Sequence, residues 1–195
     1  MAKGIPTERF EQVAVASGDE LLRWLDANHA REEGVWLVTW KKSVPDRYVS
    51  AEEILDAVVV YGWIDGIRRK LDDERTMQLI APRRTQAWAK SYKDRVERLI
   101  ADGRMQPPGE ASIAAGKASG LWDYWADVDA LIDPDDLRAA LDRDAAAAAY
   151  YDGTGASYRR NLLRWVKLAK TAPTRAKRIA QIVQACARGD RIAQM

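Results

Sequence analysis

The sequence predicts an α+β fold, in which a small, mostly antiparallel sheet with covering helices is followed by an all-helical C-terminal portion. Segments rich in β-branched and aromatic residues, which favour strands, occur before Pro82. After Pro82 the apolar spacing is helical, and the chain ends in two successive apolar stripes that predict a helical hairpin. We expect an α+β domain at residues 1–105 and a helical portion at 106–195 packed on it, with 156–189 as a basic hairpin.

Local signals place each element of the first portion. Ser17 with Glu20, and Ser50 with Glu53, have the spacing of a capping box, so each serine should begin a helix. Gly62 stands where the second helix should end, because glycine readily adopts the left-handed conformation that follows a helix. In chain order, the expected elements are a strand at 10–15, a helix from Ser17, a strand at 35–40, a helix from Ser50, and strands at 63–71 and 76–81.

The same kind of signal predicts helices alone in the rest of the chain. The alanine tract at 145–149 should be helical, because alanine has the highest helix propensity. The last two helices carry apolar residues at i, i+3, i+4 and i+7, so they should pack against each other as the hairpin. The expected helix starts are Ser91, Asp133, Ser157 and Thr174.

Composition excludes several classes of chemistry. The 195 residues include one cysteine, Cys186, and one histidine, His29, which excludes an intramolecular disulfide, a cysteine-rich zinc site and a multi-histidine metal centre. We therefore predict no metal and no cofactor. No apolar run reaches the roughly 18 residues of a membrane span, and residues 1–10 lack the apolar core of a secretory signal. We expect a cytoplasmic protein without a transmembrane segment.

Charge is distributed unevenly along the chain. Residues 121–155 hold 2 basic and 9 acidic side chains, whereas residues 156–195 hold 10 basic and 1 acidic. The two segments could fold back and neutralise each other, which we favour, or the second could present a basic face to a polyanion such as nucleic acid. On the first interpretation nucleic acid binds only weakly, if at all. The candidate polyanion-binding residues are Arg159, Arg160, Arg164, Lys167, Arg175, Lys177 and Arg178.

Asp65 is the residue that ordinary strand structure explains least. Strands disfavour aspartate, and strict alternation would place its carboxylate among apolar neighbours. Its partner could be Arg83 or Arg84, or Arg68 if the glycine at position 66 forms a β-bulge. The carboxylate either fixes the bulge or a backbone amide, which we favour, or it serves a ligand or acid–base chemistry.

Arginines and a tryptophan follow at positions 83–88, before the expected helix at Ser91, and such a cluster suits an anion. The candidate ligand-binding residues are therefore Trp63, Asp65, Arg68, Arg83, Arg84 and Trp88. The sequence assigns no catalytic residue.

Several motifs together resemble the YdeI/OmpD-associated, or bacteriocin-protection, family. They run from about Trp36 to Gly189 and comprise Tyr61-Gly62-Trp63-Ile64-Asp65-Gly66, Pro82-Arg83-Arg84 with Trp88, Gly103-Arg104-Met105 with Gly109, Ser157-Tyr158-Arg159-Arg160, Trp165, Ala169-Lys170 and Thr174-Arg175-Ala176-Lys177-Arg178-Ile179. The sequence departs from the family pattern at Val60, Tyr61, Ala89 and Tyr92, where cysteine, phenylalanine, serine and asparagine are usual. The resemblance implies a connection with tolerance of antimicrobial peptides or with envelope stress, and it implies no established reaction.

Three functional hypotheses follow. The preferred one is a non-enzymatic binding or protection protein. The alternatives are a polyanion or nucleic-acid binder that uses the basic hairpin, and a small-molecule enzyme or sensor with its site at Asp65, Arg83 and Arg84. A small anionic ligand or a protein partner would fit these hypotheses, and the sequence leaves the oligomeric state open.

Overall fold

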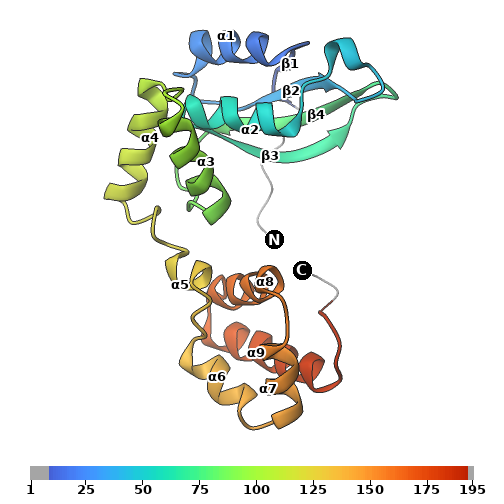
Figure 1. The fold of residues 1–195 in the computed structure, drawn as a ribbon, viewed down its shortest axis with the longest axis vertical. Helices are drawn as coiled ribbons and strands as arrows, with labels where there is room; N and C mark the ends of the chain where they lie inside the picture. The colour runs from blue at the N-terminus through green and yellow to red at the C-terminus, as the bar shows by residue number, and fades with distance from the viewer. Residues whose placement is uncertain (1–8, 193–195) are drawn as a thin grey trace. The chain divides into compact units, whose positions relative to one another are not determined.

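The computed structural model of the chain describes residues 9–192 and divides into two compact units (Figure 1). Unit 1 ends at Asp123 and contains the sheet, and unit 2 begins at Tyr124. Every regular element described in unit 2 is a helix. The predicted α+β class, with a helical C-terminal portion, is confirmed.

Four strands of unit 1 form one sheet in the order β1-β2-β4-β3. They are β1 (Gln12–Ala14), β2 (Val35–Trp40), β3 (Trp63–Lys70) and β4 (Arg75–Pro82). β4 pairs antiparallel with both β2 and β3, whereas the short β1 joins β2 in parallel. The sheet is thus mostly antiparallel, as predicted, with β3 at one edge.

The helices of unit 1 are α1 (Gly18–Asn28), the short 3-10 helix η2 (Pro45–Arg47), α2 (Ala51–Val60), α3 (Lys90–Ala101) and α4 (Pro107–Ala118). Ser17 accepts a hydrogen bond from the amide of Glu20, and Ser50 and Glu53 form both bonds of a capping box. Gly62 follows α2 with φ of +72°, a conformation that a side chain would strain. The predicted starts of α1 and α2 and the predicted end of α2 are therefore confirmed.

The division between the units lies after Asp123, later than the boundary after residue 105 expected from the sequence. Ile113 of α4 belongs to the same apolar core as α2 and Trp88. A Cβ atom at Gly109 would lie only 2.3 Å from the carbonyl oxygen of Val60, so α4 packs on α2 as closely as glycine allows. Because α4 is part of the core of unit 1, it cannot begin the second unit.

Unit 2 consists of α5 (Ala126–Asp129), α6 (Asp135–Leu141), α7 (Ala145–Asp152), α8 (Ala156–Lys167) and α9 (Ala172–Ala187). Its core includes Leu162 and Val166 from α8 together with Ile179, Ile182 and Cys186 from α9. These residues are the two predicted apolar stripes, and they face each other as a hairpin. Among residues 9–192, no helix combines the length and the apolar character needed to cross a bilayer.

The four helix starts expected at Ser91, Asp133, Ser157 and Thr174 all differ from those in the structure. α6 begins after Pro134 and α8 begins after Gly155, and no side chain caps either of them. α3 begins after Ala89 instead of at Ser91, and no side chain caps it. The preceding residue, Trp88, is 1% exposed, so burial of this ring positions the start of α3. α9 begins before the expected Thr174, because Thr171 accepts a hydrogen bond from the Thr174 amide and the proline between them is tolerated in a first turn.

Candidate functional site

A bulge in β3 determines the surroundings of Asp65. The register with β4 shifts between Asp65 and Arg68, which places both side chains beside Gln78 of β4. Gln78 donates from Nε2 to Oδ2 of Asp65 at 2.9 Å, and its Oε1 accepts from Nη2 of Arg68 at 2.8 Å. The bulge anticipated at Gly66 is present, but Arg68 reaches the carboxylate only through the Gln78 amide.

Tyr92 of α3 engages the other oxygen of Asp65. Its hydroxyl donates to Oδ1. Burial raises the pKa of the Tyr92 phenol, and the hydrogen bond to Asp65 raises it further. Both carboxylate oxygens therefore have a donor inside the protein, and the aspartate ties β3 to β4 and to α3.

Arg83 lies next to this network without an ion pair to Asp65. Its guanidinium carbon is 4.0 Å from the ring centre of Trp88 and 4.5 Å from that of Tyr92. Nη1 donates to the carbonyl oxygen of Gln86 at 3.2 Å, whereas Nε and Nη2 are buried without a hydrogen-bond partner among the described residues. Burial lowers the pKa of the guanidinium. Stacking on two rings holds this cation in place.

The structure brings together four of the six candidate ligand-binding residues, namely Asp65, Arg68, Arg83 and Trp88. Trp63 lies elsewhere in the core, where its Nε1 donates to the carbonyl oxygen of His29. Arg84 is exposed and donates to the carbonyl oxygen of Glu32 at 3.2 Å. The sequence analysis did not connect Gln78 or Tyr92 with Asp65, because neither lies near Asp65 in the chain.

A second ionic cluster, which the sequence analysis did not identify, joins α2 to the region of α3. Asp56 is 6% exposed and accepts hydrogen bonds from Arg95, Arg98 and Arg104. Burial would raise the pKa of Asp56, but the bonds from Arg98 and Arg95 outweigh it and lower the pKa. An aspartate inside the apolar run at 54–60 was the available signal. Its three partners make the cluster a structural cross-link.

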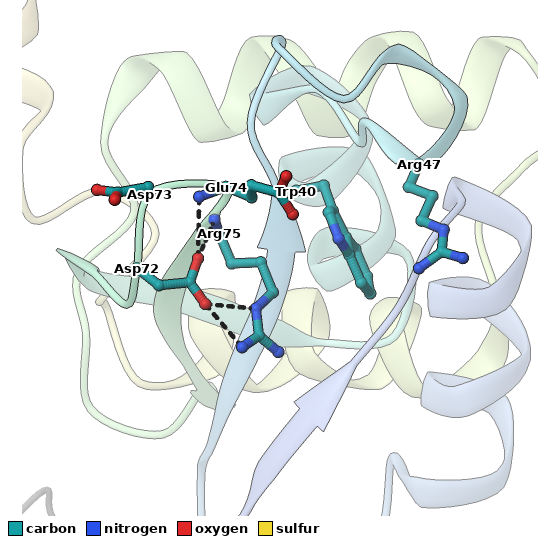
Figure 2. Close-up of a pocket in the computed structure, with 6 residues that line it drawn as sticks. All are labelled: Trp40, Arg47, Asp72, Asp73, Glu74 and Arg75. Atoms are coloured by element: carbon teal, nitrogen blue, oxygen red, sulfur yellow. Dashed lines mark hydrogen bonds and ion pairs between the residues drawn. The ribbon is translucent and has the colours of Figure 1, made fainter.

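A hollow of about 580 Å³ lies at the turn between β3 and β4. Figure 2 shows the residues that line it, which are Trp40, Arg47, Asp72, Asp73, Glu74 and Arg75. Asp72 accepts from the amides of Glu74 and Arg75 and from Nε of Arg75, which closes the turn. The Arg75 bond lowers the pKa of Asp72. Arg47 lies over the Trp40 ring. In this hollow Asp72 and Arg75 are thus bonded to each other, and Arg47 is in contact with a ring.

In unit 2 the acidic and basic segments neutralise each other. The ion pairs join Arg159 to Asp133 at 3.3 Å, Arg164 to Asp129 at 3.8 Å, Lys167 to Asp127 at 2.6 Å and Arg175 to Asp136 at 2.6 Å. Burial would raise the pKa of Asp127, but the bond from Lys167 lowers it. The bond from Arg175 lowers the pKa of Asp136. Four of the seven candidate polyanion-binding residues are therefore engaged within the unit.

The other three candidate polyanion-binding residues differ in how far their side chains are bonded within the protein. Arg178 donates to the carbonyl oxygen of Trp165 and lies 5.3 Å from the centre of that ring. Arg160 has a buried Nε without a hydrogen-bond partner among the described residues, and Lys177 is exposed. The basic charge open to a polyanion is much smaller than the sequence count suggests.

Unit 2 also contains a buried cluster around Asp133. The hydroxyl of Tyr151, a residue with no exposed surface, donates to Oδ1 of Asp133 at 2.6 Å. Arg159 pairs with the same carboxylate, and its guanidinium carbon is 5.0 Å from the centre of the Tyr151 ring. Burial raises the pKa of Tyr151, and Asp133 adds to the effect. Arg138 also approaches Asp133.

Within residues 9–192, no group of three or more histidine, cysteine, aspartate or glutamate side chains is arranged to hold a metal ion.

The comparisons with known proteins match the two units to two families. A family model described as Domain of unknown function (DUF8412) matches residues 13–112, just over half of the chain. The chain belongs to this family. A second model, described as Bacteriocin-protection, YdeI or OmpD-Associated, matches residues 130–189. No curated protein and no solved structure matches the chain.

The YdeI/OmpD-associated resemblance noted in the sequence is confirmed, and the match places it in unit 2. The motifs between Tyr61 and Gly109 lie instead in the region matched by DUF8412. In the structure two of their glycines have a packing role, since Cβ atoms at Gly62 and Gly109 would approach the carbonyl oxygens of Pro108 and Val60 within 3 Å. This part of the motif maintains the contact between α2 and α4.

Proposed function

We propose that the protein is a non-enzymatic binding or protection protein that contributes to tolerance of antimicrobial peptides or of envelope stress. The observation that carries the proposal is the match of residues 130–189 to the family described as bacteriocin-protection. That match covers most of unit 2, from α6 to the end of α9.

The side-chain arrangement favours binding over catalysis. A general base needs a lone pair directed at a substrate proton. Each Asp65 oxygen already accepts a hydrogen bond, one from Tyr92 and one from Gln78. Arg83 lies over the rings of Trp88 and Tyr92 and forms no ion pair with Asp65 among the described residues. This supports a structural role for Asp65 and weighs against the enzyme alternative at Asp65, Arg83 and Arg84.

We also propose that the protein acts in the cytoplasm. Its single cysteine is buried and free, which suits a reducing compartment because no disulfide has to form. Cell fractionation with an antibody against the native protein tests this, and recovery mainly from the periplasm or the membranes would contradict it. Such a location would not permit direct contact with an outer-membrane porin.

A deletion strain tests the protective role. Deletion of the gene in its native host should lower the minimum inhibitory concentration of cationic antimicrobial peptides, and a plasmid copy should restore it. A copy carrying Leu162→Asp, which places a charge in the core of unit 2, should fail to restore tolerance. A copy carrying Asn161→Asp, which places the same charge at an exposed position of α8, is the matched control. Unchanged susceptibility of the deletion strain to peptides and to envelope stress would reject the proposal.

A further inference from the structure

A second hollow in unit 1, of about 500 Å³, lies where two helices end and a third begins. Asp26 and His29 come from the end of α1, Tyr61 follows α2, and the start of α4 supplies Gln106, Pro107, Pro108 and Ala111. Its lining is mainly apolar, and Asp26 is its one carboxylate. The lining contains no lysine or arginine. None of these residues belongs to the Asp65 network.

The hydrogen-bonding groups of this hollow favour a donor-bearing ligand. Asp26 is exposed, accepts from the Tyr61 hydroxyl at 3.3 Å, and forms no ion pair with any described residue. At the start of α4, where backbone amides could otherwise bind an anion, the first two residues are Pro107 and Pro108, which have no N–H. The site therefore offers a carboxylate acceptor, has no lysine or arginine in its lining, and receives no amide N–H from the first two residues of α4.

The ends of α1 and α2 also favour a cationic ligand in this hollow. α1 and α2 both end at the hollow, and neither has a basic residue in its last turn. The C-terminal end of a helix carries partial negative charge, which favours a nearby cation. In addition, the rings of His29 and Tyr61 lie nearly parallel, with centres 6.2 Å apart, and the face of a tyrosine attracts cations.

We infer that this hollow binds the lysine or arginine side chain of a cationic peptide. The ammonium or guanidinium group bonds to the Asp26 carboxylate, and the alkyl stem lies against Pro107, Pro108 and Ala111. Asp26, Gln106, Pro107 and Ala111 are all exposed, so the hollow is open to solvent. An open site of this kind accommodates one side chain of a larger ligand, whereas an independent small molecule is usually enclosed.

This inference rests on the proposed function, because it identifies the peptide-binding surface that a protection protein would use. Of the two kinds of partner expected from the sequence, a small anionic ligand and a protein, a cationic peptide corresponds to the second. It also assigns peptide recognition to the DUF8412 region, outside the bacteriocin-protection match.

Nuclear magnetic resonance of the full chain tests the inference, because His29 is the single histidine and gives one imidazole signal. The probes are a synthetic lysine-rich peptide, the same peptide with every lysine acetylated, and spermidine. The lysine peptide should shift the His29 signal, and the acetylated peptide should not. Spermidine should bind more weakly, since it lacks neighbouring residues to contact the rim.

Asp26→Asn should raise the Kd of the lysine peptide about fivefold, the effect of losing one solvent-exposed ion pair. Asp123→Asn removes the same charge from an exposed position outside the hollow and should leave the Kd unchanged.

The inference is overturned if the lysine peptide fails to bind, if it binds without moving the His29 signal, or if Asp26→Asn and Asp123→Asn give equal Kd values. Tighter binding of spermidine than of the peptide would also overturn it in favour of a free polyamine. None of these outcomes alters the susceptibility test on the deletion strain, so failure of this site and failure of the protective role remain distinguishable.

Discussion

Each unit contains an aspartate that accepts a hydrogen bond from a tyrosine hydroxyl, with an arginine over the tyrosine ring. In unit 2 these residues are Asp133, Tyr151 and Arg159, and the arginine also pairs with the aspartate. Because opposite charges meet inside one cluster, the burial of each is compensated by the other.

In unit 1 the corresponding residues are Asp65, Tyr92 and Arg83, but the second aspartate oxygen accepts from Gln78. Arg83 is left with ring contacts, one bond to a carbonyl oxygen, and two buried N–H groups without a partner among the described residues. The same three residue types thus give an ion pair in unit 2, where Nε of Arg159 is buried without a partner among the described residues, and in unit 1 a cation over two rings with two such nitrogens. The two clusters differ because the aspartate is bonded to the neutral amide of Gln78 in unit 1 and to the cationic Arg159 in unit 2.

Replacing Asp133, which accepts from both Tyr151 and Arg159, should cause the largest loss of stability. Asp133→Ala leaves Arg159 and the Tyr151 hydroxyl without their partner, which should lower the unfolding free energy of unit 2 by about 3 kcal/mol. Hydrogen exchange of the slowest amides in unit 2 measures this. Asp135→Ala, at an exposed position of the same unit, is the control. A loss no larger than that of the control would show that the pair is not a structural cross-link.

Asp65→Asn should destabilise unit 1 less, by about 1–2 kcal/mol. An asparagine oxygen can still accept from Tyr92, but its NH₂ group then faces the NH₂ group of Gln78. Gln78 cannot turn over without losing its bond from Arg68. Amide exchange in β3 and β4 reports the effect, with the exposed Asp73→Asn as control. A variant as stable as the parent would contradict a structural role for this carboxylate.

Methionine in place of each arginine tests the comparison directly. Arg159→Met should lower the stability of unit 2 by about 2 kcal/mol, because Asp133 loses its closest cation while buried. Arg83→Met keeps contact with the two rings and removes the partnerless N–H groups, so the change in unit 1 should be under about 1 kcal/mol. Equal losses in the two units would mean that the two arginines are compensated alike.

The smallest effect is expected for nucleic acid. Since four candidate residues of unit 2 are paired internally, duplex DNA should bind with a Kd no tighter than about 10⁻⁶ M at physiological salt. A gel-shift titration at two salt concentrations measures it. Nanomolar, sequence-selective binding would favour the polyanion hypothesis over a binding or protection role.

Features that depend on neighbours in the chain were predictable, and those that depend on packing were not. The caps at Ser17 and Ser50 and the turn at Gly62 are local, and the sequence predicts each of them. The pairing of the acidic segment with the basic hairpin was also predictable, because the charges occur in adjacent blocks. Which aspartate meets which arginine depends on the positions of α5, α6 and α8 and could not be read from the sequence.

The surroundings of Asp65 illustrate the same distinction. The bulge at Gly66 was one of the expected alternatives, since glycine in a strand often marks one. Tyr92 is 27 positions away and reaches Asp65 because burial of Trp88 sets where α3 begins. The hollow at Asp26 is assembled from three helices, and its residues show no pattern in the sequence.

The position of Cys186 gives unit 2 a single-site chemical probe. The thiol is 2% exposed on α9, and burial raises its pKa, so both access and thiolate formation are suppressed while the hairpin is closed. A thiol reagent can modify the chain at this one atom only after α9 separates from the helices packed against it. The rate of modification therefore counts the opening events of unit 2, even when unit 1 stays folded.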